Sequence, residues 1–191
     1  MLIGGASHRF GSPKALARID GETLAERAWR TLGEVADERM AVGKAAYGLN
    51  LPFPVLDDGS TVQAPLAGLV AGLQTASHDL AVVLPVDCPL VTTELLLELA
   101  CACARADAAV PQTGPLPGAY RRTALPELER CLAAGRLSLR HALSALRTQV
   151  VPSDAGLLVN VNTPADLDGL VRRAGSQLDF VRRLLAPGPP A

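Results

Sequence analysis

The chain has 191 residues, of which 49% are hydrophobic, 19% charged and 3% aromatic, a size and composition that exclude a fibre, a disulfide scaffold and a disordered tail. Its 18 basic and 19 acidic residues give a formal net charge of −1, so no global field attracts nucleic acid or an anionic membrane. No apolar run reaches the roughly 18 residues of a membrane-spanning helix. We expect a cytoplasmic protein with one domain over residues 1–175, followed by an extension over residues 176–191 that ends in a frayed Pro/Gly tail.

Short apolar or β-branched runs alternate with longer helical patterns, which predicts an α/β domain with a mostly parallel sheet. The predicted strands are Met1–Ile3, Met40–Val42, Phe53–Leu56, Leu80–Val86, Ala108–Val110, Gly118–Arg121, Gln149–Val151 and Leu157–Val161. The run from Leu80 to Leu84 is apolar throughout, so we expect a central strand that is buried on both faces. The first strand has barely three residues, so either the true start codon lies upstream or this strand is unusually short.

Capping residues mark the helix starts. Thr23 and Glu26 have the spacing of a capping box, in which each side chain bonds the backbone of the other residue. Other starts are predicted from a proline suited to a first helical position or from a capping hydroxyl; these residues are Pro65, Pro126, Ser138 and Thr163. Cys101 and Cys103 fall in an Ala/Leu-rich helical pattern, where we expect both to be buried as small apolar side chains rather than to bind zinc.

A glycine-rich loop follows the first strand, where residues 2–16 read LIGGASHRFGSPKAL. The backbone amides of Gly4 and Gly5 can point at phosphate oxygens. Arg9 can bind the same anion through two hydrogen bonds, and Lys14 can follow it as a flexible point charge. The alternative is an ordinary turn with two solvated cations. The spacing matches neither the G-x-x-x-x-G-K-[ST] motif nor the G-x-G-x-x-G motif.

Asp87 follows the predicted central strand, at the end where open α/β sheets bind ligands. A carboxylate there can hold Mg²⁺ beside nucleotide phosphates; alternatively, Asp87 caps the turn before the next helix. Asn160 and Asn162 alternate with a valine, so both point to one face and can complete the site, unless Asn162 only helps the chain turn. Arg121 follows a flexible Gly/Pro stretch and is either a site for an anionic second substrate or a solvated residue.

The loop pattern G-G-x-S-x-R-x-G-x-P-K-A-L resembles the signature of the nucleotidyltransferases that include molybdenum cofactor guanylyltransferase and related cytidylyltransferases. Further matching segments follow in order: LDD at 56–58, APLAGL at 64–69, PVDCP at 85–89, PLPGAYR at 115–121 and NVNTPADL at 160–167. The resemblance covers roughly residues 2–170. It implies a Rossmann-like nucleotidyltransferase fold with three layers and a mostly parallel sheet.

The resemblance also implies an activity, the transfer of GMP from GTP to molybdopterin with release of pyrophosphate and with Mg²⁺ as cofactor. The implied nucleotide-binding residues are Leu2, Ile3, Gly4, Gly5, Lys14, Asp58 and Asp87, with Asp57 as a rival to Asp58. Either of these two acids could instead be an ordinary turn residue. Arg9 and Lys14 are implied to be catalytic, because they would neutralise the leaving pyrophosphate, and Asp87 to bind the metal. Transient contact with molybdoenzymes or cofactor-delivery proteins is a further implication.

Two details leave the identity of the nucleotide substrate open. Gly4 and Gly5 match the guanylyltransferase pattern, whereas Pro13 before Lys14 is typical of cytidylyltransferase relatives. Lys44 lies in a segment that lacks the asparagine expected near guanine. The alternatives are therefore a cytidylyl- or sugar-phosphate nucleotidyltransferase, or a non-catalytic module that binds a nucleotide or phosphate.

Overall fold

The computed structural model describes residues 1–4, 10 and 13–172. The predicted roles of Gly5 and Arg9 fall outside the described residues, as does the predicted tail over residues 176–191. None of the helices in these described ranges is long and apolar enough to cross a membrane.

The central sheet has two sections that meet at its first strand. Its strands are β1 (Leu2–Ile3), β4 (Ala41–Gly43), β5 (Val55–Asp57), β6 (Leu80–Val83), β7 (Ala108–Pro111), β8 (Gly118–Arg121) and β9 (Thr148–Val151). The strand orders are β1-β4-β5 and β6-β8-β7-β9, and only β8 runs antiparallel to its neighbours in these described strands. Leu2 joins the sections, because its amide donates to the Leu84 carbonyl at 2.9 Å and its carbonyl accepts from the Val86 amide at 3.0 Å. The predicted mostly parallel sheet is confirmed.

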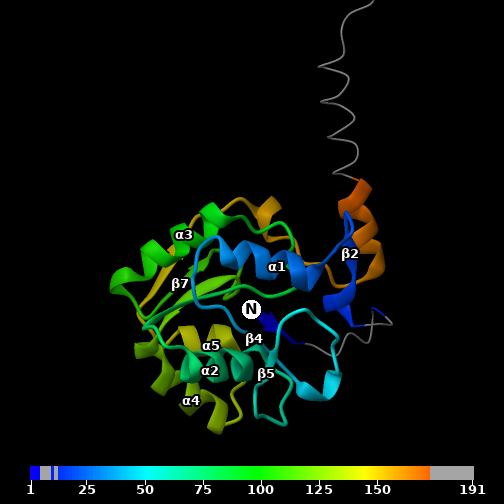
Figure 1. Cartoon of the computed structure of the whole chain (residues 1–191). Coiled ribbons are helices and arrows are strands. Elements are labelled where there is room, and N and C mark those ends of the chain that lie inside the picture. Colours follow the sequence, from blue (N-terminus) through cyan, green and yellow to red (C-terminus); the bar gives the residue numbers. More distant parts are fainter. Residues whose placement is uncertain (5–9, 11–12, 173–191) are drawn as a thin grey trace, which may run out of the picture.

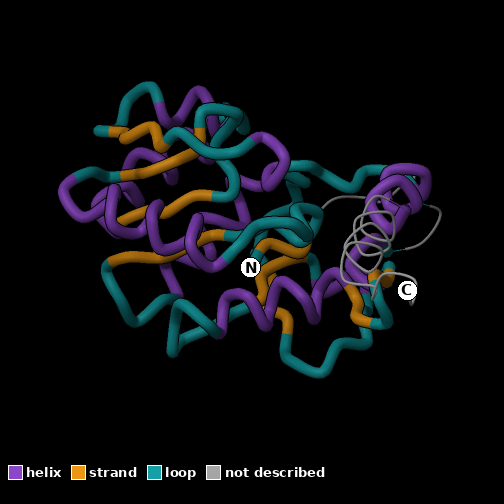
Figure 2. Tube along the Cα trace, turned by 90° about the horizontal axis from the view of Figure 1, so that it is seen from above, coloured by secondary structure: helices purple, strands orange, loops and turns teal. Residues whose placement is uncertain are grey.

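Helices cover both faces of the sheet and complete three layers (Figure 1). One face carries α1 (Leu24–Gly33) and α3 (Thr93–Ala102), and the other carries α2 (Pro65–Thr75), α4 (Leu125–Ala133) and α5 (Leu139–Leu143). The view from above shows the strands in orange among the helices in purple (Figure 2). The order of strands and helices thus reproduces the α/β architecture predicted from the sequence.

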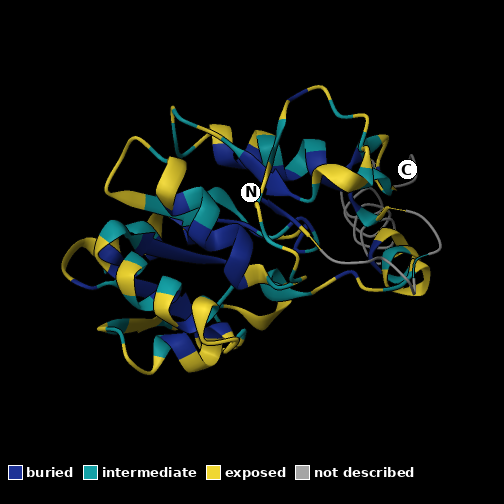
Figure 3. Cartoon of the chain, turned by 90° about the horizontal axis from the view of Figure 1, so that it is seen from below, coloured by how far each residue is buried: buried dark blue, intermediate teal, exposed yellow. Residues whose placement is uncertain are grey.

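Two apolar clusters hold the layers together. Leu32 of α1 and Leu99 of α3 belong to the cluster that includes Ile3, and Leu69 of α2 and Leu128 of α4 belong to the other. These side chains are at most 4% exposed. Full burial of one leucine contributes about 1.5–3 kcal/mol, so the two clusters stabilise the stacked layers. Figure 3 shows the buried residues in dark blue along the strands and on the inner helix surfaces.

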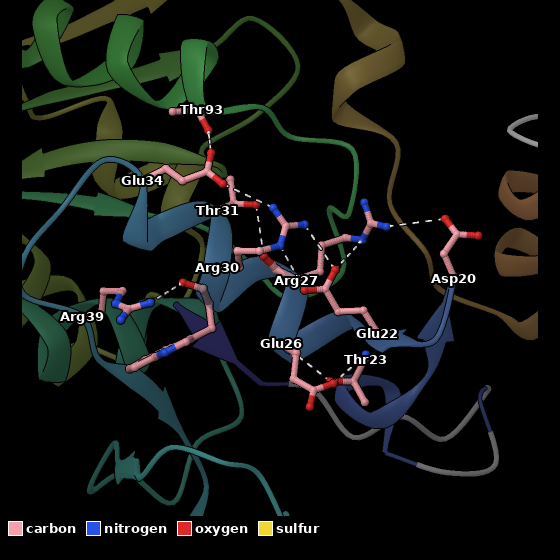
Figure 4. A network of polar contacts seen from close by, with 11 residues as sticks. Asp20, Glu22, Thr23, Glu26, Arg27, Arg30, Thr31, Glu34, Arg39 and Thr93 are labelled. Carbon is pink, nitrogen blue, oxygen red and sulfur yellow. Dashed lines mark hydrogen bonds and ion pairs between the residues drawn. The ribbon is translucent and has the colours of Figure 1, made fainter. Parts of the chain in front are cut away.

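The predicted capping box at the start of α1 is confirmed (Figure 4). The Glu26 amide donates to the Thr23 hydroxyl oxygen at 3.1 Å, and the Thr23 amide donates to the Glu26 carboxylate at 2.8 Å. Farther along the helix, Arg30 donates to Glu22 at 3.1 Å and to Glu34 at 3.3 Å. These contacts fix the direction in which α1 leaves the preceding strand.

The other predicted helix starts are confirmed, with one shift. Pro65 opens α2, and the Ser138 hydroxyl caps α5. Thr163 accepts from the Asp166 amide at 3.2 Å and caps a helix over residues 164–172. Pro126 stands at the second position of α4 rather than the first, because this helix begins one residue earlier.

The predicted strand Leu157–Val161 is wrong. Asp154 accepts a hydrogen bond from the amide two residues farther on and begins the 3-10 helix η5 (Ala155–Leu158), so the chain turns where an extended strand was expected. Beyond this turn, the Val161 amide donates to the Asp87 carbonyl at 2.8 Å. That contact ties the segment to the end of the central strand without a regular ladder.

Two predictions of burial are also wrong. Leu80 at the start of β6 is 36% exposed, and Ala81 and Val82 are half-buried. These residues border a cavity of about 300 Å³ at the amino end of the strand, so the apolar run is fully covered only towards its carboxyl end. Cys101 is exposed near the end of α3, whereas Cys103 is buried as predicted.

A short hairpin that was not predicted from the sequence lies between the glycine-rich loop and α1. It consists of β2 (Arg18–Ile19) and β3 (Glu22–Thr23), paired antiparallel. Its turn residues Asp20 and Gly21 both have positive φ, 52° and 83°. An Asp-Gly pair is favoured in two-residue turns of this kind, so the signal was present in the sequence.

Candidate active site

Lys14 and Asp87 form an ion pair at the carboxyl ends of the central strands. The Lys14 Nζ lies 3.1 Å from Asp87 Oδ2 and 3.0 Å from Asn162 Oδ1. The two charged side chains are 17% and 23% exposed, so both remain accessible to a ligand. The structure thus brings together three of the predicted site residues from three separate segments of the chain.

Backbone contacts position Asp87 between its neighbours. The Val86 amide bonds to β1, and the Asp87 carbonyl accepts from the Val161 amide at 2.8 Å. The adjacent Cys88 thiol donates to Asn160 Oδ1 at 2.9 Å. Burial, followed by the charge of the Asp87 carboxylate, raises the pKa of Cys88, so the thiol stays protonated and remains a donor. This contact holds the Asn160 amide beside the carboxylate.

Asn162 is positioned from its other side by the helix that follows it. The backbone amides of Asn162 and Thr163 donate to Asp166 Oδ2 at 2.9 and 2.8 Å. These hydrogen bonds hold the pKa of Asp166 below its ordinary value, so its carboxylate is ionised near neutral pH. Asn162 therefore does both: it helps the chain turn into the following helix, as expected, and its side chain contacts Lys14.

A cavity of about 260 Å³ opens beside this ion pair. Gly4 follows β1, Lys44 follows β4, Asp58 follows β5 and Asp87 follows β6, and all four line the cavity together with Asn160. Because parallel strands place their carboxyl ends at one edge, residues distant in sequence meet at this cavity. The start of α2 also borders it, and a helix amino terminus favours anions.

Asp58 and Asp57 have different surroundings. The Asp58 Oδ1 accepts from the Lys44 Nζ at 2.6 Å, and both side chains are largely buried, at 7% and 13% exposure. Asp57 instead accepts from the Ala45 and Gly59 amides at 2.6 and 2.7 Å, and these hydrogen bonds lower the pKa of Asp57. Asp58 thus lines the cavity, whereas Asp57 holds a turn together.

Other predicted site residues lie elsewhere. Leu2 lines the cavity, but the Ile3 side chain packs in the core. Arg121 lies opposite Leu80 at the amino end of β6 and donates to the Ala104 carbonyl at 2.7 Å. Its strand runs antiparallel, so the structure does not bring Arg121 to the cavity.

Neither Tyr47 nor the contact of Cys88 with Asn160 was predicted from the sequence. Tyr47 ends the 3-10 helix η2 (Ala45–Tyr47) and lines the cavity. Lys44 was considered only as a departure from the family pattern. Its place directly after a parallel strand is a signal that could have identified it as a cavity residue.

The structure resembles known nucleotidyltransferases. Its TM-score with molybdopterin-guanine dinucleotide biosynthesis protein A from Archaeoglobus fulgidus is 0.74, at 26% identity over 92% of this chain and 97% of that chain. The 2-C-methyl-D-erythritol 4-phosphate cytidylyltransferase from Thermus thermophilus shares the fold at a TM-score of 0.71 and 20% identity, over 87% and 95% of the two chains. The predicted Rossmann-like nucleotidyltransferase fold is confirmed.

The sequence has close relatives among curated proteins. It is 36% identical to a probable molybdenum cofactor guanylyltransferase from Deinococcus radiodurans, over 94% of this chain and 96% of the relative. It is 33% identical to a protein of the same description from Chloroflexus aggregans, over 87% and 89%. A family model described as a MobA-like NTP transferase domain matches residues 1–151. Fold and site together define a nucleotidyltransferase. The chain belongs to the MobA-like NTP transferase family.

Nucleotidyltransferases of this family generally use a divalent metal ion. In the described part of the chain, no three His, Cys, Asp or Glu side chains gather as a metal cluster. The Asp87 carboxylate nevertheless shares a partner with each of two amide oxygens: Lys14 Nζ donates to both Asp87 and Asn162, and the Cys88 thiol lies 3.8 Å from Asp87 Oδ1 and 2.9 Å from Asn160 Oδ1. Such a set of few oxygen donors fits a hard cation that is held mainly by substrate phosphates and water.

Proposed function

We propose that this enzyme transfers GMP from GTP to a molybdopterin acceptor and releases pyrophosphate, with Mg²⁺ as its metal ion. The observation that carries the proposal is the Lys14–Asp87 pair, which sets a phosphate-binding cation against a carboxylate suited to a hard cation. The relatives named as molybdenum cofactor guanylyltransferases support the choice of substrates. A nucleoside triphosphate substrate also favours the expected cytoplasmic location.

In the proposed reaction, a phosphate oxygen of the acceptor attacks the α-phosphorus of GTP. The bond from this phosphorus to the oxygen that bridges to the β-phosphorus breaks, and pyrophosphate leaves with the bonding electron pair. The attacking phosphate is already ionised near neutral pH, since phosphate monoesters lose their second proton at about pH 6. A general base is therefore not required, and catalysis rests on positioning and charge neutralisation.

In the proposal, one group of residues binds the phosphates and another binds the metal ion. Lys14 neutralises charge on the phosphates, and Gly4, Gly5 and Arg9 hold them through backbone amides and a guanidinium group. Asp87 would hold Mg²⁺ with help from the neighbouring asparagine amides. When bound, the metal supplies positive charge to the phosphate oxygens.

The decisive experiment measures pyrophosphate release from GTP, CTP and ATP in turn, each with Mg²⁺ and molybdopterin. Release from GTP alone supports the proposal. Release from CTP in preference would replace it with a cytidylyltransferase, and nucleotide binding without release would leave only a binding module. Arg105→Ala is a suitable control variant, because Arg105 is exposed at the end of the 3-10 helix η3 (Cys103–Arg105), before β7, and does not line the cavity.

A further inference from the structure

The Cys88 thiol lies in the wall of the cavity, and the proposed reaction assigns it no part. Cys88 is 3% exposed, yet it lines the cavity beside Asp87. Its amide donates to the Pro85 carbonyl at 3.2 Å, and its carbonyl accepts from the Val91 amide at 3.4 Å. Because burial and both backbone contacts fix this residue, its sulfur has a defined place next to the carboxylate.

The thiol connects Asp87 to Asn160. Cys88 Sγ lies 2.9 Å from Asn160 Oδ1 and 3.8 Å from Asp87 Oδ1. A thiol has a single proton, so it donates to the nearer oxygen. Asn160 is an exposed residue, and among the hydrogen bonds of the described residues its side chain makes this one alone. The buried thiol therefore sets the orientation of an amide that would otherwise rotate in solvent.

The Asp87 carboxylate has a second link, which carries a charge. Lys14 Nζ donates both to Asp87 Oδ2 and to Asn162 Oδ1. An ammonium is attracted to phosphate oxygens, so substrate competes with Asp87 for Lys14 in the proposed reaction. A thiol is a weak, neutral donor without this attraction. The link through Cys88 should therefore persist after the substrate has drawn Lys14 away.

We propose that Cys88 is a positioning residue for the divalent metal ion, because its thiol holds Asn160 Oδ1 beside the Asp87 carboxylate. The inference rests on the part of the proposed function that assigns the metal ion to Asp87. An amide oxygen has two lone pairs, so Asn160 Oδ1 can accept from the thiol and still offer one pair to a cation. Partners of this kind orient metal ligands and raise metal affinity without touching the metal themselves.

Titration with Mn²⁺, followed by electron paramagnetic resonance of the free ion, tests this role without nucleotide and without turnover. Mn²⁺ suits the same carboxylate and carbonyl ligands as Mg²⁺. Cys88→Ala should raise the dissociation constant for Mn²⁺ roughly tenfold, as expected when one partner of a metal ligand is removed. Cys88→Ser should stay close to the wild type, because a hydroxyl also donates to the amide oxygen. Equal constants for Cys88→Ala and the wild type, or an equal loss in both variants, would overturn the role.

Cys103→Ala is the matched control for the loss of a buried sulfur. Cys103 is also buried, and its thiol lies 3.5 Å from the Ala119 carbonyl oxygen, but it does not line the cavity. Thermal melting should show similar losses of stability in the two alanine variants, whereas only Cys88→Ala should lose Mn²⁺ affinity. An equal loss of affinity in Cys103→Ala would trace the effect to general destabilisation and overturn the role of Cys88.

A double variant separates action through Asn160 from a direct effect on Asp87. Asn160→Ala should weaken Mn²⁺ binding by itself, and Cys88→Ala should add nothing in that background, since the two residues act through one contact. A further loss in the double variant would show that Cys88 acts independently of Asn160, and it would overturn the assignment.

Turnover distinguishes a failure of this inference from a failure of the proposed function. Cys88→Ala should need more Mg²⁺ for half-maximal pyrophosphate release and regain the wild-type kcat at saturating Mg²⁺; a kcat that stays low would contradict a role in metal affinity. If Mn²⁺ binding follows the expected pattern but no nucleotide gives pyrophosphate release, the proposed function fails and the positioning role stands. If the wild type binds Mn²⁺ no more tightly than Asp87→Asn, the metal site and the inference fail together.

Discussion

The Lys14 ammonium lies 3.1 Å from the Asp87 carboxylate, although the two residues are separated by 73 positions in the sequence. Each charge compensates the other in the unliganded protein, so neither is left unpaired at the edge of the sheet. A triphosphate with its metal ion carries both complementary charges. It can therefore replace this contact without leaving either side chain uncompensated.

Lys14→Ala should reduce turnover by about 10²–10³, because one preorganised positive charge on the phosphates is lost. Steady-state pyrophosphate release measures the effect. Lys14→Arg should retain part of the activity, since the charge remains with a different geometry. A near-normal kcat for Lys14→Ala would contradict the assigned role, provided that Arg105→Ala is also normal.

Removal of divalent metal with EDTA should abolish turnover, and added Mg²⁺ should restore it. Asp87→Asn should lower kcat by about 10²–10³, because the amide keeps the shape of the side chain but loses its charge. Part of this loss should be recovered at high Mg²⁺ concentration. A titration of activity against Mg²⁺ checks the prediction, and an unchanged metal requirement in Asp87→Asn would exclude Asp87 as a ligand.

Gly43→Ala should destabilise the fold at the cavity edge. A Cβ added at Gly43 would lie 2.2 Å from the Ile3 carbonyl oxygen, so β1 and β4 must separate. Overpacking of this kind costs about 1–3 kcal/mol. The matched change Gly72→Ala adds a Cβ at 3.7 Å from Val42, an ordinary contact inside α2, and should be neutral or stabilising by up to about 1 kcal/mol. Urea unfolding of both variants distinguishes the two cases; equal stabilities would contradict the prediction.

Asp107 should make stability depend on acid pH. Hydrogen bonds from the Arg147 side chain, followed by one from Thr123, hold the pKa of Asp107 well below its ordinary value of 3.8. Because the folded-state pKa is depressed, this stability is fully present above pH 3.8 and is lost as the pH falls further. Arg147→Met should lower the free energy of unfolding at neutral pH only modestly, since Arg147 is largely exposed and its ion pair with Asp107 is screened by water.

The difference between the free energies of unfolding of the wild type and Arg147→Met should shrink as the pH falls below about 4, because Asp107 first takes up a proton in the unfolded chain and, at still lower pH, in the folded wild type, where the contact with Arg147 is then lost. Chemical denaturation at neutral and acid pH gives the two free energies of unfolding. A difference that stays constant over this range would show that Arg147 acts through packing rather than through the ionised carboxylate.

The meeting of Lys14 with Asp87 could be predicted from the sequence, because both follow strands whose carboxyl ends share one edge of the sheet. Arg121 could not be placed in the same way. The apolar pattern of β8 does not report its direction, and an antiparallel strand puts its last residue at the opposite edge. The existence of β8 was therefore predictable, whereas its direction was not.

The Lys44–Asp58 pair shows a second limit of prediction from the sequence. It depends on the register in which Gly43 lies opposite Asp57, which brings the next residues of both strands together. Hydrophobic patterns fix which face of a strand is buried but not which residues of two parallel strands are opposite one another. Tyr47 depends in turn on the 3-10 turn after β4, for which the sequence analysis predicted no element.

In the backbone pairing that the structure describes, the two sections of the sheet are joined through Leu2 alone. Gly4 lies two residues after Leu2, and Asp87 lies two residues after Pro85, the residue of the other section that pairs with Leu2. A ligand that contacts both Gly4 and Asp87 would bridge the two sections of the sheet. At a free concentration 100 times its dissociation constant, such a ligand would stabilise the native state by about 2.7 kcal/mol. Bound substrate would therefore protect the enzyme from heat and proteolysis at the place where the sheet is least continuous.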